Sequence, residues 1–259
     1  MRETALITGA SGGIGEDLAR LIAADGRDVI LLARSADKLQ ALADELARAH
    51  KITASVLAID LSRSEAADGV RAALEERHLA IDMLVNNAGF GGLGPFAGES
   101  ADEVAGMLQV NVVALTMLTR LLLPGMIERR RGRILNVAST ASFQPGPLMA
   151  VYYATKAYVT SLSLALSDET AGTGVTVTCL CPGPTRTGFQ ERAQMTGSRL
   201  FKRGMVMDSA AVARAGYDGM MAGRHLVIPG LANKIGVQSV RFVPRMVAAR
   251  IAKSLNADA

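Results

Sequence analysis

The sequence of 259 residues predicts an α/β fold, with a doubly wound, mainly parallel seven-stranded sheet and helices on both faces. Two observations lead to this prediction. Short apolar runs alternate with amphipathic stretches along most of the chain, which is the pattern of buried parallel strands joined by crossover helices. A glycine-rich turn directly follows the first apolar run and opens a helical stretch, as at a phosphate-binding βα turn.

Seven apolar runs have the length and composition of interior strands. They cover residues 5–8, 29–33, 55–59, 83–85, 134–138, 175–180 and 226–228. Between the second and third runs, Leu39, Leu42 and Leu46 recur at three- and four-residue spacing behind Ser35, a residue suited to cap a helix. This stretch therefore completes one βαβ unit.

Two further helices follow later in the chain. Ser100 and Glu103 have the spacing of a capping box ahead of a long apolar helix over 102–129. Pro124 lies inside that helix and is expected to kink it, because proline removes a backbone donor. A second long helix is expected over 152–171.

Composition and the chain start exclude several classes of protein. Hydrophobic residues make up 49% and charged residues 20%, which argues against disorder, and the absence of Trp weakens any nucleic-acid reading. Neither a secretory signal nor a membrane-spanning segment is expected, so a cytoplasmic location is predicted. Cys179 and Cys181 are expected to be reduced core residues, and the three histidines lack metal-ligand spacing, so no metal site is predicted.

The charge is unevenly distributed along the chain. Residues 1–191 carry 17 Lys and Arg against 21 Asp and Glu, whereas residues 192–259 carry 11 against 3. A basic carboxyl quarter favours contact with an anionic membrane surface, an acyl carrier protein or a phosphate-bearing substrate; an ordinary solvated helix or an oligomer contact is the alternative.

Nothing in the sequence marks a second domain, because repeats, linkers and low-complexity tracts are absent. We expect one domain over 1–259. Within it, residues 1–190 would form the cofactor-binding and catalytic core, 187–209 a substrate lid, and 210–259 the carboxyl-terminal helices and the last strand. The lid is expected where the strand–helix rhythm fails.

The glycine-rich turn after the first strand carries the first functional signal. Glycines at 9, 13 and 15 let backbone amides approach a phosphate, and the following helix adds partial positive charge. A tight turn that exists for steric reasons is the alternative. The expected cofactor contacts here are Gly9, Ser11, Gly13, Ile14 and Gly15.

Six motifs in chain order resemble those of the short-chain dehydrogenase/reductase family. They are the glycine turn, Asn86–Gly89 after the fourth strand, Asn111, Ser139 after the fifth strand, Tyr152 with Lys156 four residues later, and Pro182-Gly183 after the sixth strand. The resemblance covers residues 1 to 190. It implies a Rossmann-type fold and an oxidoreductase that interconverts carbonyl and alcohol groups.

Tyr152 and Lys156 have the spacing that places two side chains on one helix face. A tyrosine needs its pKa of about 10 lowered by roughly 3 units to act near neutrality, and a nearby ammonium shifts the pKa in that direction. The resemblance makes Tyr152 the general acid/base and Ser139 the residue that orients the substrate oxygen. Tyr153 breaks the family's spacing, and Ser142 is interpreted as a loop-capping group.

Asn111 interrupts an apolar run and must have a hydrogen-bonding partner, because an unpaired buried amide costs about 1–3 kcal/mol. The resemblance implies a kinked main chain and a water that links Asn111 to Lys156 in a proton relay. A helix-packing amide satisfied by backbone groups is the alternative.

The end of the second strand predicts NADP(H) as the cofactor. Ala33 stands where an NAD site usually has an acid, and Arg34 is placed to pair with a 2′-phosphate beside Ser35. By resemblance, Asp60 contacts the adenine, with a helix-capping Asp as the alternative. The remaining expected cofactor contacts are Leu61, Asn87, Ala88, Gly89, Tyr152, Lys156, Pro182, Gly183, Thr185 and Thr187.

The expected substrate-contacting residues are apolar: Phe90, Phe96, Phe189 and Met195. They favour a medium-sized hydrophobic ketone, aldehyde or alcohol over a sugar. An NADP(H)-binding regulator or sensor with little turnover is the alternative function. By resemblance, we expect a homodimer or homotetramer built on the two long helices, and nucleic acid is not an expected partner.

Overall fold

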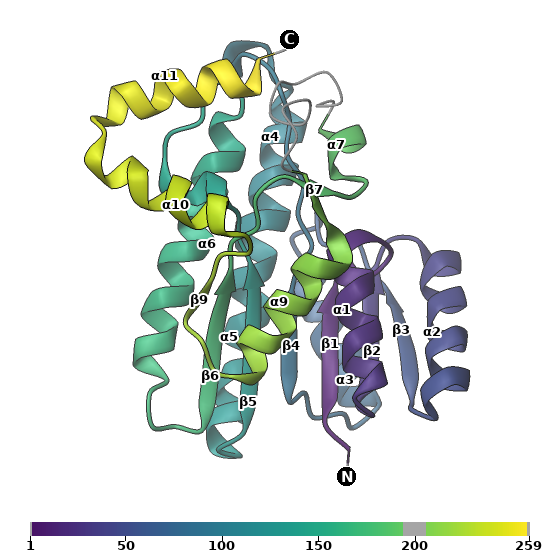
Figure 1. Ribbon diagram of the computed structural model, residues 1–259. Coiled ribbons are helices and arrows are strands. Elements are labelled where there is room, and N and C mark those ends of the chain that lie inside the picture. Colours follow the sequence, from purple (N-terminus) through teal and green to yellow (C-terminus); the bar gives the residue numbers. More distant parts are fainter. Residues whose placement is uncertain (1, 194–205, 258–259) are drawn as a thin grey trace.

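The structure is a computed structural model that describes residues 2–193 and 206–257 (Figure 1). Met195, one of the expected substrate contacts, lies outside the described residues, as does most of the predicted lid. Within that lid, the structure describes only its two ends, 187–193 and 206–209.

Seven strands form one sheet in the order β3-β2-β1-β4-β5-β6-β9, and each neighbouring pair is parallel. The predicted fold class is confirmed, and each predicted run matches its strand to within two residues at either end. The strands are β1 (Thr4–Thr8), β2 (Asp28–Ala33), β3 (Ala54–Ala58), β4 (Met83–Asn86), β5 (Gly132–Val137), β6 (Val175–Leu180) and β9 (Leu226–Val227).

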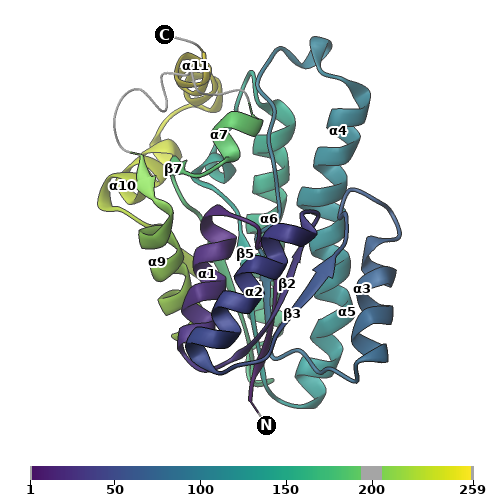
Figure 2. The same cartoon turned by 90° about the vertical axis from the view of Figure 1, so that its right-hand side faces the viewer.

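Helices cover both faces of this sheet, as Figure 2 shows edge-on. On one face lie α1 (Gly13–Ala24), α2 (Ala36–His50) and α9 (Ser209–Met221); on the other lie α3 (Ala66–Glu76), α5 (Leu115–Glu128) and α6 (Ala150–Glu169). Strand β1 serves both cores: Ala5 and Ile7 belong to the first and Leu6 to the second. This alternation places apolar side chains on both sides of the strand.

The connection from β3 to β4 reverses the strand order, because β4 pairs with β1 on the side opposite β2. The loops that leave β1 and β4 therefore diverge to opposite faces at the carboxyl edge. A crevice at such a reversal is where ligands bind in open α/β sheets.

The predicted long helix over 102–129 is divided into three parts. α4 (Ala101–Leu108) passes through a π-helical turn (Gln109–Ala114) into α5, and Asn111 lies within that turn. The expected capping box is wrong, because Ser100 occupies the N-cap position without a side-chain capping bond. Pro124 is accommodated inside α5, so the irregularity occurs at 109–114 rather than at the proline.

The chain after β6 builds a cap above the carboxyl edge of the sheet (Figure 1). Two short strands pair there, and two helices follow β9. The elements are β7 (Thr185–Arg186), α7 (Phe189–Arg192), β8 (Met207–Asp208), α10 (Leu231–Ser239) and α11 (Arg245–Asn256), with single helical turns at Phe96–Gly98, Thr140–Phe143 and Val240–Phe242.

Within the described part of the chain, one helical stretch of 28 residues, Ala101–Glu128, has the length and composition to cross a membrane; its most apolar 18-residue window has a mean hydropathy of 1.7. Such a stretch is weak support for a membrane span, since core helices of globular proteins have the same properties. Here Leu115, Leu118 and Met126 are buried on the inner side. The prediction that no segment spans a membrane stays a prediction.

Candidate active site

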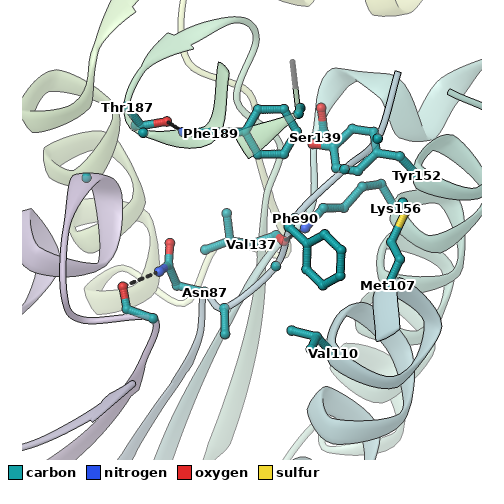
Figure 3. A pocket seen from close by; sticks show the side chains of 18 of the residues that line it. Asn87, Phe90, Met107, Val110, Val137, Ser139, Tyr152, Lys156, Thr187 and Phe189 are labelled. Carbon is teal, nitrogen blue, oxygen red and sulfur yellow. Dashed lines mark hydrogen bonds between the residues drawn. The ribbon is translucent and has the colours of Figure 1, made fainter. Parts of the chain in front are cut away.

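A cleft of about 1400 Å³ opens at the carboxyl edge of the sheet, where the loops leaving β1, β4, β5 and β6 meet. All the expected cofactor contacts except Gly15 line it. So do Ser139, Phe90 and Phe189, and Figure 3 shows the central part of this cleft. The structure thus brings together groups that are more than 100 residues apart in the sequence.

The glycine turn forms one end of the cleft. Gly9 has a φ of +66°, and a Cβ there would lie 2.7 Å from Nδ2 of Asn87, so the position excludes a side chain for two reasons. Gly13 has a φ of +57°, and a Cβ there would lie 3.0 Å from Cγ2 of Thr187. The helix α1 begins at Gly13, and its N-cap Gly12 supplies no side-chain capping bond. The first amides of α1 therefore face a cradle suited to a phosphate.

Thr8 and Asn87 join the ends of β1 and β4. The Thr8 hydroxyl donates to the Val85 carbonyl at 3.2 Å and accepts from the backbone amides of Asn87 and Ala88, each at 3.0 Å. In return, Nδ2 of Asn87 donates to the carbonyls of Thr8 (3.0 Å) and Gly9 (3.2 Å). These hydrogen bonds fix the glycine turn against the loop after β4. Thr8 is therefore a functional candidate that was not expected from the sequence, although it begins the glycine motif.

Arg34, Ser35 and Lys38 line the cleft beyond β2, and both cationic side chains are exposed there. Lys38 is a second basic group that was not expected from the sequence, although one helical turn separates it from Arg34. Ser35 is the N-cap residue of α2 but makes no side-chain capping bond.

Asp60 also lines this end of the cleft. Its Oδ1 accepts from the backbone amide and the hydroxyl of Ser62, at 3.0 and 2.8 Å. The Ser62 amide, together with the charge of Arg34, holds the carboxyl pKa below its usual range. The alternative of a helix-capping Asp is not what the structure shows, because α3 begins only at Ala66.

Ser139, Tyr152 and Lys156 form one wall of the cleft (Figure 3). Ser139 lies two residues after β5, at the N-cap of the turn Thr140–Phe143, and its hydroxyl accepts from the Ala141 amide at 3.1 Å. Tyr152 and Lys156 come from the first turns of α6, and Lys156 Nζ lies 5.8 Å from the Tyr152 ring centroid. The ammonium donates to the Val137 carbonyl at 2.8 Å. A hydroxyl, a phenol and an ammonium thus converge in one place.

The electrostatics of this wall are set by desolvation. Desolvation raises the pKa of Tyr152, and a hydrogen bond with Ser139 opposes that rise. Burial lowers the pKa of Lys156 to about 8, although the nearby thiols of Cys179 and Cys181 act in the opposite direction. The prediction that the ammonium lowers the tyrosine pKa is therefore wrong for this arrangement. The physical reason is that the ammonium is bound to Val137 rather than to the phenol oxygen.

Asn111 lies behind the wall, fully buried, and Nδ2 donates to Thr155 Oγ1 at 3.1 Å. Its amide also pairs with both backbone groups of Phe90: Oδ1 accepts from the amide at 3.0 Å and Nδ2 donates to the carbonyl at 2.9 Å. A Cβ on Gly89 would lie 3.0 Å from Asn111 Oδ1 and 3.3 Å from Lys156 Nζ, so these two polar groups approach the same point. The kinked main chain is present as the π-helical turn, and the amide is satisfied by backbone and Thr155.

The neighbours of the catalytic candidates have structural contacts. Tyr153 is buried, and its hydroxyl donates to Oδ1 of Asn256 in α11 at 3.2 Å. Asn256 in turn donates to the Pro147 carbonyl at 3.0 Å. Ser142 donates to the main-chain oxygen of Lys156 at 2.8 Å, which ties the loop after β5 to α6. Cys179 and Cys181 are free and buried, as expected.

The segment after β6 closes the cleft from above. Thr185 Oγ1 donates to the Gly183 carbonyl at 2.9 Å, and Thr187 Oγ1 accepts from the Phe189 amide at 3.2 Å. The Phe189 ring lies 5.2 Å from the Tyr152 ring, centroid to centroid. This segment therefore reaches the catalytic wall, as Figure 3 shows.

The expected substrate contacts divide into two groups. Phe90 and Phe189 line the cleft, and Phe90 turns its ring toward Met107 and Val110 (Figure 3). Phe96, by contrast, is 63% exposed and does not line the cleft, so its expected substrate contact is not supported. Its place in a single helical turn after Pro95 points the ring to solvent. Met107 and Met149 line the cleft and were not expected from the sequence.

Comparison with known proteins identifies the class. Residues 3–196 match the short chain dehydrogenase family. The NADP-dependent 3-hydroxy acid dehydrogenase YdfG of Salmonella typhi is 41% identical over 179 residues, which are 69% of this chain and 71% of that protein. The hydroxysteroid dehydrogenase-like protein 1 of Gallus gallus is 34% identical over 200 residues, 76% of this chain but only 60% of that protein.

Solved structures show the same relationship. A short-chain dehydrogenase from Sphingobium yanoikuyae in complex with NADPH superposes with a TM-score of 0.83 at 32% identity, over 93% of this chain and 94% of that one. The fold and the cleft thus define a nucleotide-linked oxidoreductase. The chain belongs to the short-chain dehydrogenase/reductase family, whose members act on CH–OH and C=O groups.

Proposed function

We propose that this protein is an NADP(H)-dependent oxidoreductase that reduces the carbonyl of a medium-sized hydrophobic substrate to an alcohol, or catalyses the reverse reaction. The observation that carries the proposal is the convergence of Ser139, Tyr152 and Lys156 in a cleft that also holds the glycine turn. The turn fits a dinucleotide, because side chains are sterically excluded at Gly9 and the amides of α1 are open to the cleft. When bound, the nicotinamide supplies or accepts hydride.

Ser139 and Tyr152, in the wall of the cleft, would bind the substrate oxygen. Ser139 and Tyr152 lie side by side in the wall of the cleft, where their hydroxyls would orient and polarise a substrate carbonyl oxygen. The Tyr152 hydroxyl lies beside Ser139 in the wall of the cleft, where it would donate the proton that the reduced carbonyl needs. Lys156, whose Nζ donates to the Val137 carbonyl in the wall of the cleft, would hold the ribose of the cofactor. Asn111 supports the wall from behind through Phe90 and Thr155.

Preference for NADP(H) is supported by the two cations beyond β2. Arg34 and Lys38 line the cleft where a ribose 2′-substituent would lie, and Ala33 leaves no carboxylate to bind a 2′-hydroxyl. The Salmonella relative is named as NADP-dependent, and the Sphingobium structure holds NADPH.

We propose that the groups attached to the carbonyl carbon of the substrate are apolar. Phe90, Met107, Met149 and Phe189 surround the part of the cleft next to Tyr152. Such side chains bind hydrocarbon and offer few partners for sugar hydroxyls.

Homo-oligomerisation is proposed through the outer faces of α4, α5 and α6. Large apolar side chains are exposed there: Leu108, Val113, Met117, Tyr158 and Leu164. Thr116 and Tyr158 are hydrogen-bonded at 3.0 Å, which places these helices side by side. An apolar face of this kind is typical of a subunit contact.

Purified protein mixed with NADPH and a panel of ketones, aldehydes and diketones tests the function. Oxidation of NADPH with a hydrophobic carbonyl is the expected result. Tight NADPH binding without turnover on any of these compounds would instead support the regulator or sensor, the alternative that the complete catalytic wall disfavours.

A further inference from the structure

The carboxyl-terminal helices expose an unusual amount of hydrocarbon. Phe242 is 88% exposed, Leu231 74% and Met246 68%, and Ile235, Val247 and Ile251 are exposed as well. All six belong to α10, α11 or the turn between them, which form the outermost layer above the sheet edge (Figure 1). We call this set, with the cations named next, the α10–α11 surface.

Cations are interspersed among these apolar side chains. Lys234, Arg241, Arg245, Arg250 and Lys253 are exposed, and within the described residues none of them is in an ion pair. The sequence has no Asp or Glu between Asp218 and Asp258, so the layer carries no internal counter-charge. Five of the eleven Lys and Arg residues of the carboxyl quarter thus belong to one structural layer.

The helix α11 separates its two faces clearly. Ala248, Ala249 and Ala252 are buried against the protein, whereas Met246 and Arg250 lie on the opposite side at 100° per residue. The helix α11 thus packs on the protein through small alanines. Its larger side chains Met246, Arg250 and Ile251 are exposed. Large apolar residues together with Arg and Lys on one exposed face are typical of helices that lie in a lipid interface.

We propose that the α10–α11 surface docks on an anionic lipid bilayer. Charge complementarity selects this occupant: the cations meet anionic headgroups while the exposed side chains enter the acyl boundary. A second copy placed face to face would bring two sets of five unpaired cations together, which disfavours self-association through this surface.

Vesicle co-sedimentation tests the docking. Vesicles of equal parts phosphatidylglycerol and phosphatidylcholine, or of phosphatidylcholine alone, are mixed with the protein at roughly 0.05 M and 0.5 M salt. Binding to the anionic vesicles at low salt, weakened at high salt, is expected. Phe242→Ser with Met246→Ser should lower the affinity at least tenfold, and Arg241→Gln with Arg245→Gln should do the same, since each cation is worth about fivefold.

Ile127→Ser is the matched control, because Ile127 is also exposed but lies at the opposite end of the molecule, at the end of α5. This variant should bind like the natural chain. Absence of binding to both vesicle types, or equal binding by the Phe242 and Met246 double variant, would overturn the proposal. A lower mass of that double variant in light scattering would also overturn it, since another copy would then cover the surface.

A different observation concerns the groove beneath this layer. An apolar groove of about 390 Å³ lies between α10 and α11, and Val237, Val240 and Leu255 are among its walls. Thr140, Gln144, Pro184 and Leu255 line both this groove and the active-site cleft. The two spaces therefore lie next to each other and share a wall at the loop after β5.

We infer that this groove holds the apolar tail of an elongated substrate whose carbonyl lies at Ser139 and Tyr152, an inference that rests on the proposed function. Gly236 lines the groove, and a Cβ there would meet no atom within 4 Å. Gly236→Phe therefore fills the groove without straining α10. Gln238→Phe, on the exposed side of the same helix, is the matched control.

A short and a long straight-chain methyl ketone distinguish the outcomes. Gly236→Phe should lower kcat/KM at least tenfold for the long ketone and leave the short one unchanged, whereas Gln238→Phe should change neither. If the natural protein reduces both ketones and Gly236→Phe affects them equally, the groove inference fails alone. If the natural protein reduces no carbonyl compound, the proposed function fails first.

Discussion

Asn111 binds both backbone groups of Phe90, with Oδ1 at 3.0 Å from the amide nitrogen and Nδ2 at 2.9 Å from the carbonyl oxygen. One buried side chain thus replaces the secondary-structure partners that the loop after β4 lacks. The π-helical turn at Gln109–Ala114 is what brings the amide to this position. The irregular helix and the ordered cleft wall are therefore parts of one arrangement.

Asn111→Leu tests this arrangement. The substitution keeps a similar volume but removes the buried hydrogen bonds of the Asn111 amide to Phe90 and Thr155, each worth about 0.5–1.5 kcal/mol. We expect the free energy of unfolding to fall by about 2–5 kcal/mol in urea titrations. Thr155→Val removes only one contact of Asn111 and should cost about 1 kcal/mol. Equal stability of the Asn111→Leu variant and the natural chain would contradict the role of the amide.

Tyr152→Phe tests the proton donor. The variant retains the ring that packs on Phe189 but lacks the hydroxyl, so turnover with NADPH should fall by roughly 10²–10⁴ while NADPH binding is largely kept. Tyr153→Phe is the control, because that hydroxyl binds Asn256 and lies outside the proposed proton transfer. A loss of turnover confined to Tyr153→Phe would reverse the assignment.

Local patterns explain which parts of the fold and cleft the sequence could predict. The seven strands and the glycine turn were recognisable because buried parallel strands are continuously apolar and because Gly9 and Gly13 need positive φ. Local sequence predicts a kink at Pro124, and only the family resemblance implies a kinked main chain at Asn111. The π-helical turn at Gln109–Ala114 places Asn111 against Phe90, a partner 21 residues away that local patterns do not reveal.

Other parts of the site depend on burial and three-dimensional proximity. The direction of the Tyr152 pKa shift followed from desolvation, which the i, i+4 spacing with Lys156 does not reveal. Lys38 lines the cleft because α2 begins directly after Ser35, so that Lys38 lies in the first turn of this helix. The apolar character of Phe96 predicts a substrate contact, yet this side chain is exposed to solvent.

The stability of the protein should depend on pH through Lys156. Its pKa is lowered from 10.5 to about 8, so below pH 8 the ammonium is charged in both states and the folded state carries the cost of burying it. Between pH 8 and pH 10 the folded state releases the proton and the unfolded state keeps it, so the free energy of unfolding rises with pH. Above pH 10 the raised pKa of Tyr152 acts in the opposite direction.

Unfolding titrations of the natural chain and of Lys156→Met at several pH values measure this effect. The difference in stability between them should shift in favour of the natural chain by about 2 kcal/mol from pH 8 to pH 10, since one pKa unit corresponds to about 1.4 kcal/mol. A difference that stays constant over this range would show that Lys156 titrates at its ordinary value.

Introducing charged side chains on α5 and α6 tests whether these helices form a subunit contact. Met117→Asp with Leu164→Asp places two carboxylates on the exposed apolar face, which should reduce the mass in light scattering to that of a smaller assembly. Leu231→Asp, at a still more exposed site on α10, should leave the mass unchanged. A monomeric natural protein, or a mass that falls only for Leu231→Asp, would exclude this contact.

Cofactor preference is tested at the end of β2. Arg34→Ala removes one proposed partner of the 2′-phosphate and nothing that NADH requires, and a charged hydrogen bond is worth about 1.5–3 kcal/mol. NADPH affinity should therefore fall about tenfold to a hundredfold, while NADH affinity stays constant in fluorescence titrations. Lys38→Ala should act in the same direction, and the double variant should bind both cofactors with similar affinity.

Arg48→Ala is the control, because Arg48 lies at the far end of the same helix and donates to the Asp44 carbonyl outside the cleft. Equal weakening of NADPH and NADH by Arg34→Ala would mean that Arg34 supports the cleft as a whole rather than reading the 2′-phosphate.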